Sequence, residues 1–265
     1  MYKKASKTTL ILTFLFFIIV IFLFTPNLLK ANENQITMPV DAWPPFRIIE
    51  KQNYKGIDFD LLEEVQKRLD KKIVYKRYPW TRSLANMKNG KVDAMSGLAK
   101  RSERAKYIQY TKIPYYTCST VFYVKKGEKD IIQTYNDLQN YLIGYVDNSA
   151  YFAPFDTDKT LNKRAVTNEY QLIRMLAVGR IKVMIGTDCQ VDYDIKKLGL
   201  LGKFEKAVYK PNNKVDLYFG VSKKSPLLND IDKINQVIED IVNEGLVKEF
   251  AKKYYEWLDY LLIIA

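Results

Sequence analysis

One short stretch decides the fold of this chain: Met87-Lys88-Asn89-Gly90-Lys91-Val92-Asp93-Ala94-Met95-Ser96-Gly97. It combines a helix end, a glycine that allows a left-handed cap, a basic residue and a short apolar strand that ends at glycine. The pattern returns at Met175-Leu176-Ala177-Val178-Gly179-Arg180-Ile181-Lys182-Val183-Met184-Ile185-Gly186, and the two glycines are again seven positions apart. Helix–glycine–strand units are common, so the flanking segments must show whether the chain contains two similar lobes.

Strands and helices alternate on both sides of this stretch. The hydrophobic pattern predicts strands at 36–40, 73–75 and 92–96 and helices at 61–69 and 81–88. Around the second copy it predicts strands at 142–146 and 181–185 and a helix at 170–178. This order indicates two α/β lobes, the first with a largely parallel sheet.

Two segments rich in β-branched and aromatic residues, 117–124 and 215–221, are expected to connect the lobes as hinge strands. Helices at 227–243 and 246–257 follow the second crossing, separated by Gly245. The predicted division is therefore 32–118 plus 222–265 for one lobe and 119–221 for the other. Paired hinge strands permit closure of the lobes around a ligand.

The N-terminus resembles an export signal. Lys3, Lys4 and Lys7 precede an apolar run from Leu10 to Phe24, and a small residue follows at Ala31. The run is short for a bilayer span, which needs about 20 residues. Residues 1–31 are therefore expected to be a signal peptide and the protein to be periplasmic or otherwise extracytoplasmic, with an uncleaved anchor as the alternative.

Charge and composition narrow the classes of function. The formal net charge is +12, and removal of residues 1–31 takes away four lysines and leaves about +8. The lysines are scattered, so nucleic-acid binding is not expected. The chain has no histidine, which excludes Ser-His-Asp and Cys-His catalysis and removes the commonest zinc ligand. No cofactor or metal is expected, and Cys118 and Cys189 form either one disulfide or two buried thiols.

Several short motifs, in a fixed order, resemble the family 3 extracellular solute-binding proteins of polar amino-acid transporters. They are Trp43-Pro44-Pro45-Phe46, Gly56-Ile57-Asp58-Phe59-Asp60-Leu61, Trp80, Leu84, Gly90-Lys91-Val92-Asp93-Ala94, Ser102-Glu103-Arg104-Ala105-Lys106-Tyr107, Tyr110-Thr111 and Pro114-Tyr115-Tyr116. The resemblance implies a periplasmic-binding-protein fold of class II type, in which two α/β lobes joined by two hinge strands close on a solute.

The resemblance also implies roles for residues of the first lobe. Arg104 matches the arginine that holds the ligand α-carboxylate, a task suited to the planar guanidinium fork; the alternative is an ion pair with Glu103 or Asp93. Trp43 and Trp80 match aromatic residues against the ligand, with core packing as the alternative. Gly97 matches a backbone contact to the carboxylate.

Second-lobe residues and departures from the family pattern complete the expected site. The turn 147–150, which contains Asn148 and Ser149, matches one that faces the ligand with helix-start N–H groups, although Ser149 is as well explained as a helix N-cap. The family pattern places an acidic residue, which accepts from the ligand ammonium group, at the position of Thr187. Either Asp188 takes this role through a one-residue slip in the loop, or the ligand has no α-ammonium group. The remaining departures are Ala99 in place of Ser or Thr, Arg101 in place of Thr, and Arg82 after Trp80. The two arginines lead us to expect a cationic site that prefers anionic solutes.

The expected function is capture of a small, carboxylate-bearing solute, such as an amino acid, by a monomeric receptor that delivers it to the membrane permease of an ABC importer. The alternatives are a ligand-sensing module and an exported cyclohexadienyl or prephenate dehydratase, in which Asp188 or Asp147 would act as acid or base.

Overall fold

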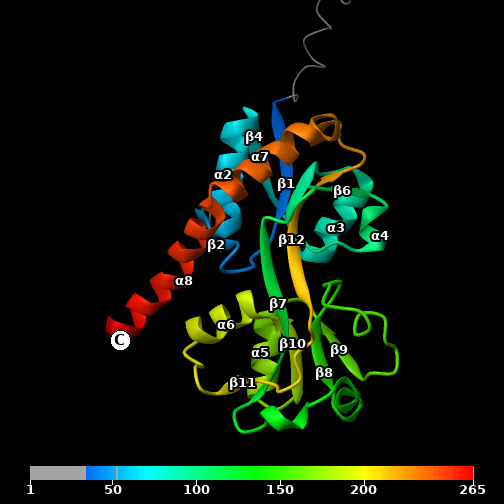
Figure 1. Ribbon diagram of the computed structural model, residues 1–265, viewed down its shortest axis with the longest axis vertical. Helices are drawn as coiled ribbons and strands as arrows, with labels where there is room; N and C mark the ends of the chain where they lie inside the picture. Colours follow the sequence, from blue (N-terminus) through cyan, green and yellow to red (C-terminus); the bar gives the residue numbers. More distant parts are fainter. Residues whose placement is uncertain (1–33, 52, 265) are drawn as a thin grey trace, which may run out of the picture. The chain divides into compact units, whose positions relative to one another are not determined.

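The computed structural model describes residues 34–51 and 53–264 (Figure 1). Both lobes belong to one compact unit, Ile36–Ala265. The expected signal at 1–31 lies outside the described residues. Among the described helices, none is long and apolar enough to span a bilayer.

The N-terminal part of the unit has short strands alternating with helices, as the hydrophobic pattern predicts. In chain order these are β1 (Gln35–Val40), β2 (Ile48–Glu50), β3 (Asn53–Lys55), α2 (Ile57–Leu69), β4 (Lys72–Arg77), α3 (Trp80–Asn89), β5 (Ala94–Leu98), α4 (Ser102–Ala105) and β6 (Ile108–Tyr110). Helix α2 buries Leu61, Leu62, Val65 and Leu69 on one face; Val65 follows Leu62 by three positions, and Leu69 follows Val65 by four. Its first turn is acidic and its last turn basic, which complements the helix dipole.

The middle of the chain repeats this alternation. Its elements are β7 (Tyr116–Lys125), η1 (Lys129–Ile131), η2 (Tyr135–Asn140), β8 (Ile143–Val146), β9 (Lys163–Val166), α5 (Glu169–Ala177), β10 (Val183–Thr187), α6 (Asp188–Lys197), β11 (Phe204–Lys206) and β12 (Lys214–Ser222). The C-terminal part consists of η3 (Pro226–Asp230), α7 (Ile231–Asn243) and α8 (Leu246–Ile264). Helix α6 has no counterpart among the expected elements because its sequence is mostly polar; Val191, Tyr193 and Ile195 nevertheless anchor it in the core.

Strands β7 and β12 connect the two lobes, as expected (Figure 1). They pair antiparallel from Lys214 with Ser119 to Leu217 with Tyr116. One sheet of order β5-β12-β7-β10-β8-β9 therefore passes from the first lobe to the second. The predicted lobe boundaries at 118/119 and 221/222 fall within or at the ends of these strands and stay a prediction.

Strand β12 adds antiparallel pairs to the first lobe, beside the strands for which the alternation predicts a largely parallel sheet. There β5 and β6 pair antiparallel with β12, because β12 returns from the second lobe and lies beside them. Parallel pairing occurs in the second lobe, where β8 pairs with both β9 and β10. Strand β12 belongs to a distant part of the sequence, so the local alternation of strands and helices does not predict its place in this sheet.

The two copies of the deciding stretch have the same backbone geometry. Gly90 and Gly179 have φ angles of 70° and 75°. The following N–H closes the helix end in both, from Lys91 to the Asn86 carbonyl at 2.9 Å and from Arg180 to the Met175 carbonyl at 2.8 Å. The helix–glycine–strand unit expected from the repeated pattern is therefore present in both lobes.

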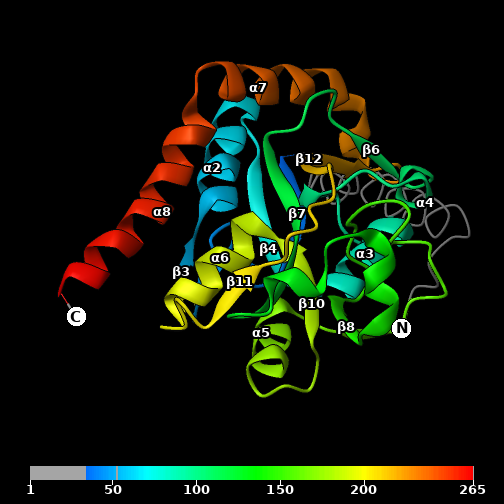
Figure 2. The ribbon, with the colours of Figure 1, turned by 60° about the horizontal axis from the view of Figure 1, so that its bottom comes forward.

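Hydrophobic clusters lie against both faces of the connecting sheet. In the first lobe, α2, α7 and α8 cover one face through a cluster that includes Leu61, Phe219, Ile234 and Ile238 (Figure 2). In the second lobe one cluster contains Phe122, Ile143 and Ile185, and another contains Leu172, Met184 and Val191. Each lobe has its own core, so the lobes can move as bodies connected by β7 and β12.

The turn at 43–47 is fixed on the start of α2. The N–H groups of Ile57 and Asp58 donate to the carbonyls of Pro45 and Phe46 at 3.1 and 2.9 Å. Gly56 permits this approach: a Cβ there would lie 2.3 Å from the Phe46 carbonyl oxygen. The backbone of a turn that carries Trp43 and Arg47 is thereby held in place.

We predict that Gly56→Ala lowers the unfolding free energy by at least ~3 kcal/mol, because a positive φ and a backbone overlap act together. Gly127→Ala is the matched control, since Gly127 has φ 85° and, its chain neighbours aside, no atom within 4 Å of the position that a methyl group would occupy; it should cost about 1 kcal/mol. Urea denaturation measures both, and equal losses would contradict the proposed overlap.

Candidate functional site

A small cavity of about 70 Å³ lies between residues of the two lobes. From the first lobe it is lined by Asp41, Ala42, Trp43, Arg47, Trp80 and Gly97, and from the second by Val146, Ser149, Thr167, Asn168 and Glu169. Four of the expected site residues, Trp43, Trp80, Gly97 and Ser149, are therefore brought together at one place.

The turn after β1 builds one wall of this cavity. Trp43 stacks on Phe46 with ring centroids 4.3 Å apart, and the Arg47 guanidinium lies 5.0 Å from the Trp43 ring centroid. Gly97, with φ 74°, faces this pair: a Cβ would lie 2.9 Å from both the Trp43 ring and Arg47 Nη1. The close approach that Gly97 allows in this structure is thus to Trp43 and Arg47.

Arg47 lines the cavity and is paired with two carboxylates. Its Nη1 donates to the Asp58 carboxylate at 2.6 Å and its Nη2 to the Asp41 carboxylate at 2.9 Å. Burial alone would lower the pKa of Arg47, but the charges of Asp41 and Asp58 outweigh it and raise that pKa above its usual value. Asp58 also accepts from Ser96 Oγ at 2.8 Å and Tyr115 OH at 2.6 Å.

Arg104 has a different environment from Arg47. It is 4% exposed, and its guanidinium donates to two backbone carbonyls, Ala99 at 3.1 Å and Asn148. The Trp80 ring centroid lies 5.4 Å from the guanidinium carbon. Burial lowers the pKa of Arg104 because neutral carbonyls compensate the lost hydration only in part.

The alternative partners considered for Arg104 are engaged elsewhere. Glu103 pairs with Lys106 at 2.8 Å on the surface. Asp93 accepts from the Thr37 N–H at 2.7 Å and from Ser225 Oγ at 2.6 Å. Neither carboxylate neutralises Arg104, so this buried cation is available to a carboxylate from outside the chain.

Asn148 joins the two lobes next to Arg104. Its carbonyl accepts from Arg104 and from Trp80 Nε1 at 3.2 Å, and its Nδ2 donates to Thr81 Oγ1 at 3.2 Å. Asn148 has φ 56°, a conformation that asparagine tolerates better than most residues. The lobes are thus in contact around the cavity.

The second-lobe wall contains two neighbouring carboxyl groups, the half-buried Glu169 and, behind it, the buried Asp194. Gln190 Nε2 donates to Glu169 at 3.1 Å and to Asp194 at 3.3 Å. Burial raises the pKa of each carboxyl to about 7, and the neighbouring carboxyl adds to the shift of Asp194. Glu169 also senses the charges of Asp41 and Arg47 across the cavity.

We predict that Asp194→Asn changes the pH dependence of stability. The folded-state pKa of Asp194 is raised, so its contribution is full below the unfolded pKa of about 4 and is lost as pH rises through about 7. The difference between these two pKa values corresponds to ~4 kcal/mol, so the variant should gain up to this amount relative to the wild type between pH 4 and pH 8. Denaturation across this range checks it, with Asp232→Asn on the exposed side of α7 as the control; parallel curves for Asp194→Asn and wild type would contradict it.

The two arginines expected to make the site cationic do not do so. Arg101 pairs with Asp156 at 2.8 Å, and the two residues line a separate hollow of about 370 Å³ together with Ala99 and Ala150. Arg82 is exposed and lies over the Tyr78 ring. The cavity beside Trp43 and Trp80 carries carboxylates instead, so the expectation of a preference for anionic solutes loses its basis.

The segment after β8 also differs from expectation. Residues 147–150 form a turn followed by irregular chain rather than the start of a helix. Ser149 is therefore not a helix N-cap, and helix N–H groups do not point from this turn to a ligand. In this turn the Asn148 carbonyl accepts a hydrogen bond from Arg104, and Ser149 lines the cavity.

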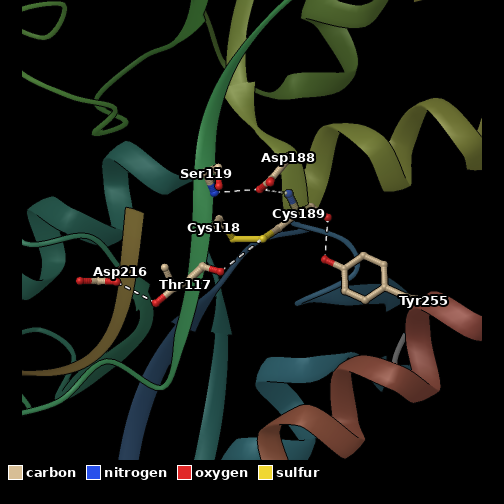
Figure 3. The surroundings of a disulfide bond; sticks show 7 residues. All are labelled: Thr117, Cys118, Ser119, Asp188, Cys189, Asp216 and Tyr255. Carbon is tan, nitrogen blue, oxygen red and sulfur yellow. Dashed lines mark hydrogen bonds between the residues drawn. A yellow bond between two sulfur atoms is a disulfide. The ribbon is translucent and has the colours of Figure 1, made fainter. Parts of the chain in front are cut away.

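Thr187 and Asp188 lie at the junction of β10 and α6, and neither belongs to the cavity lining. Asp188 Oδ1 accepts from the N–H groups of Ser119 and Cys189, each at 2.8 Å (Figure 3). Cys118 and Cys189 form a disulfide beside it, so the open question about the cysteines is answered. Asp188 thus supports the link between β7 and α6.

The same place contains the candidate metal-ligand group found among the described residues, Cys118, Asp188 and Cys189. Its two sulfur atoms are bonded to each other. The Cys189 carbonyl in addition accepts from Tyr255 OH of α8 at 2.7 Å (Figure 3). Strand β7, helix α6 and helix α8 are therefore tied together beside the hinge.

We predict that the double variant Cys118→Ala, Cys189→Ala loses up to about 4 kcal/mol of unfolding free energy. The disulfide joins cysteines 71 positions apart, and the conformational entropy that the unfolded chain gains when this loop is opened sets the value. Denaturation of the variant and of the oxidised wild type measures it. Thiol titration of the unfolded, unreduced wild type should detect no free thiol, and two free thiols would contradict the bond.

Sequence reasoning missed Asp41, Arg47 and Glu169. Each adjoins a recognised feature: Asp41 and Arg47 flank Trp43-Pro44-Pro45-Phe46, and Glu169 opens the helix of the second repeat. Charged residues next to the start of an apolar run are ordinarily solvated or act as helix caps, so their type and position gave no signal. Only the approach of the two lobes places them around one cavity.

Comparison with known proteins agrees with this architecture. The family model of bacterial extracellular solute-binding proteins, family 3, matches residues 36–256. This chain belongs to that family. The resemblance inferred from the ordered motifs is confirmed, and with it the class II periplasmic-binding-protein fold.

Individual family members are distant in sequence. A probable amino-acid-binding protein of Bacillus subtilis, YxeM, is 26% identical over 221 residues, which are 80% of each chain. A probable histidine-binding protein of Campylobacter jejuni is 27% identical over 85% of this chain and 87% of its own. The structure of AbpA, an amino acid ABC transporter substrate-binding protein of Streptococcus pneumoniae bound to L-arginine, superposes with a TM-score of 0.74 at 17% identity, covering 85% and 96% of the two chains.

Proposed function

We propose that this family 3 solute-binding protein captures an amino acid between its lobes and presents it to the membrane permease of an ABC importer. The observation that carries the proposal is Arg104, a buried guanidinium whose hydrogen bonds go to neutral carbonyls. A ligand carboxylate would supply two parallel, charge-assisted hydrogen bonds in place of the bond to Asn148. In this exchange a charged acceptor replaces a neutral one. The hydrogen bond to the charged acceptor is much the stronger of the two, because the site is buried and its local dielectric constant is low.

The size of the cavity supports a cycle of opening and closing. Pockets for small ligands usually measure several hundred Å³, whereas the cavity beside Trp43 and Trp80 measures about 70 Å³. The lobes therefore lie close together in this conformation, and entry of an amino acid requires them to separate about β7 and β12. Asn148 is the residue whose contacts with Arg104, Trp80 and Thr81 would break first.

Export and assembly complete the proposal. Residues 1–31 act as the signal that takes the chain out of the cytoplasm, and the family is extracellular. The mature receptor works as a monomer with residues 32–118 plus 222–265 as one lobe and 119–221 as the other. The names of the relatives describe binding proteins, which supports binding without turnover.

We predict that Arg104→Ala weakens binding of amino acids by at least ~100-fold, because removal of one partner of a buried charge pair costs about 3–5 kcal/mol. A thermal-shift screen of the twenty amino acids identifies the ligands, since a ligand at a hundred times its Kd stabilises the fold by about 2.7 kcal/mol. Isothermal titration calorimetry then compares the variant with Arg174→Ala, which removes an exposed arginine of α5.

Unchanged affinity in Arg104→Ala would refute the carboxylate assignment. A wild-type protein that binds none of the twenty amino acids would refute the proposed function, as would turnover of prephenate by the purified protein.

A further inference from the structure

We propose that the cavity beside Trp43 and Trp80 receives a cationic group at the end of the ligand side chain, with Glu169 and Asp41 as its acceptors. The inference rests on the proposed function and deepens it. The substrate class becomes amino acids whose side chain ends in an ammonium or a guanidinium group.

The charges around the cavity provide the first argument. One guanidinium, that of Arg47, faces two carboxylates, Asp41 at 2.9 Å and Asp58 at 2.6 Å. Glu169 adds a third carboxyl group from the opposite lobe, and its hydrogen-bond partner is the neutral amide of Gln190. Acidic groups thus exceed basic ones at this place, and a ligand cation would restore the balance.

The order of residues along the interface provides the second argument. The Arg104 guanidinium packs on Trp80, and Trp80 in turn lines the cavity. A ligand whose α-carboxylate binds Arg104 therefore has its side chain beside Trp80, directed toward Asp41 and Glu169. The indole rings offer apolar surface to the methylene groups of a long side chain, and an aromatic wall also favours a cation.

The third argument concerns the acidic residue that the family pattern expects in the second lobe. Thr187 occupies its position, and the carboxylate of the neighbouring Asp188 accepts hydrogen bonds from the N–H groups of Ser119 and Cys189. The carboxyl groups that do line the cavity are Asp41, which follows β1, and Glu169, in the first turn of α5. They come from different lobes, so a cation held between them would also hold the lobes together.

The protonation of Glu169 gives a measurable consequence of a ligand cation bound beside it. Burial raises the pKa of Glu169 to about 7. The groups that face it are Asp41 and Arg47 across the cavity, Gln190 and Asp194 on α6, and the phenol of Tyr151. A ligand cation favours the ionised form of Glu169, so its binding should release a proton near neutral pH and strengthen as pH rises from 6 to 8.

L-arginine and L-citrulline are suitable probes, because they have nearly the same shape and only arginine carries a charged side chain. In calorimetric titrations of the full-length mature protein at pH 8, we expect arginine to bind ~10–100-fold more tightly than citrulline, as for a hydrogen bond to a charged group. At pH 6 this ratio should shrink, while the affinity for citrulline stays constant.

Glu169→Gln should reduce the ratio of arginine to citrulline affinity to near one and abolish its pH dependence. Glu239→Gln removes an exposed carboxylate of α7 and should leave both unchanged. If Glu169→Gln does not fold, the pH dependence of the ratio in the wild type decides the question.

Each other outcome is decisive as well. Equal affinities of the wild type for arginine and citrulline, or an undiminished ratio in Glu169→Gln, would overturn the inference. Binding of neutral amino acids alone, still dependent on Arg104, would overturn it and leave the proposed function intact. Failure of every amino acid to bind would refute the proposed function itself.

Discussion

The buried carboxylate of Asp58 is the constraint on which the first-lobe wall of the cavity depends. It is fully buried at the start of α2 and receives hydrogen bonds from Arg47, Ser96 and Tyr115. These donors come from the turn after β1, from β5 and from the segment before β7. A buried charge is costly unless it is paired and fully hydrogen-bonded, so the three segments must meet at this point. Trp43 and Gly97, which face the cavity, are placed by the same network.

The two buried arginines show how environment gives residues of one type different partners. Arg47 is engaged by two carboxylates and holds the wall together. Arg104 donates to the carbonyls of Ala99 and Asn148, so its charge is solvated by dipoles but not neutralised. Breaking the Asn148 bond costs less than separating an ion pair, because a neutral acceptor is exchanged rather than a charge exposed. Arg104 is therefore suited to a partner that comes and goes.

The hinge consists of two strands, and a disulfide restrains it on one side. Strands β7 and β12 are the covalent connections between cores that pack separately, and this permits rotation of one lobe against the other. On one side of these strands the disulfide joins β7 to α6, and Tyr255 of α8 contacts the Cys189 carbonyl of α6. This cross-link places one side of the hinge under constraint, so opening should take place on the side of Trp80 and Asn148. The residues proposed to contact a ligand lie on that side.

The sequence by itself determined the repeated α/β alternation, the glycine caps at 90 and 179 and the two crossing strands, because periodicity and turn chemistry are local properties of the chain. The order of its short motifs resembled a known family, and that resemblance singled out Arg104, Trp43 and Trp80. Only the tertiary structure decided that β12 pairs antiparallel with β5, that Arg101 is neutralised by Asp156, and that Asp41, Arg47 and Glu169 share one cavity. These outcomes depend on which distant segments meet, and the charge that a side chain presents to a ligand is set by those neighbours rather than by the residue type.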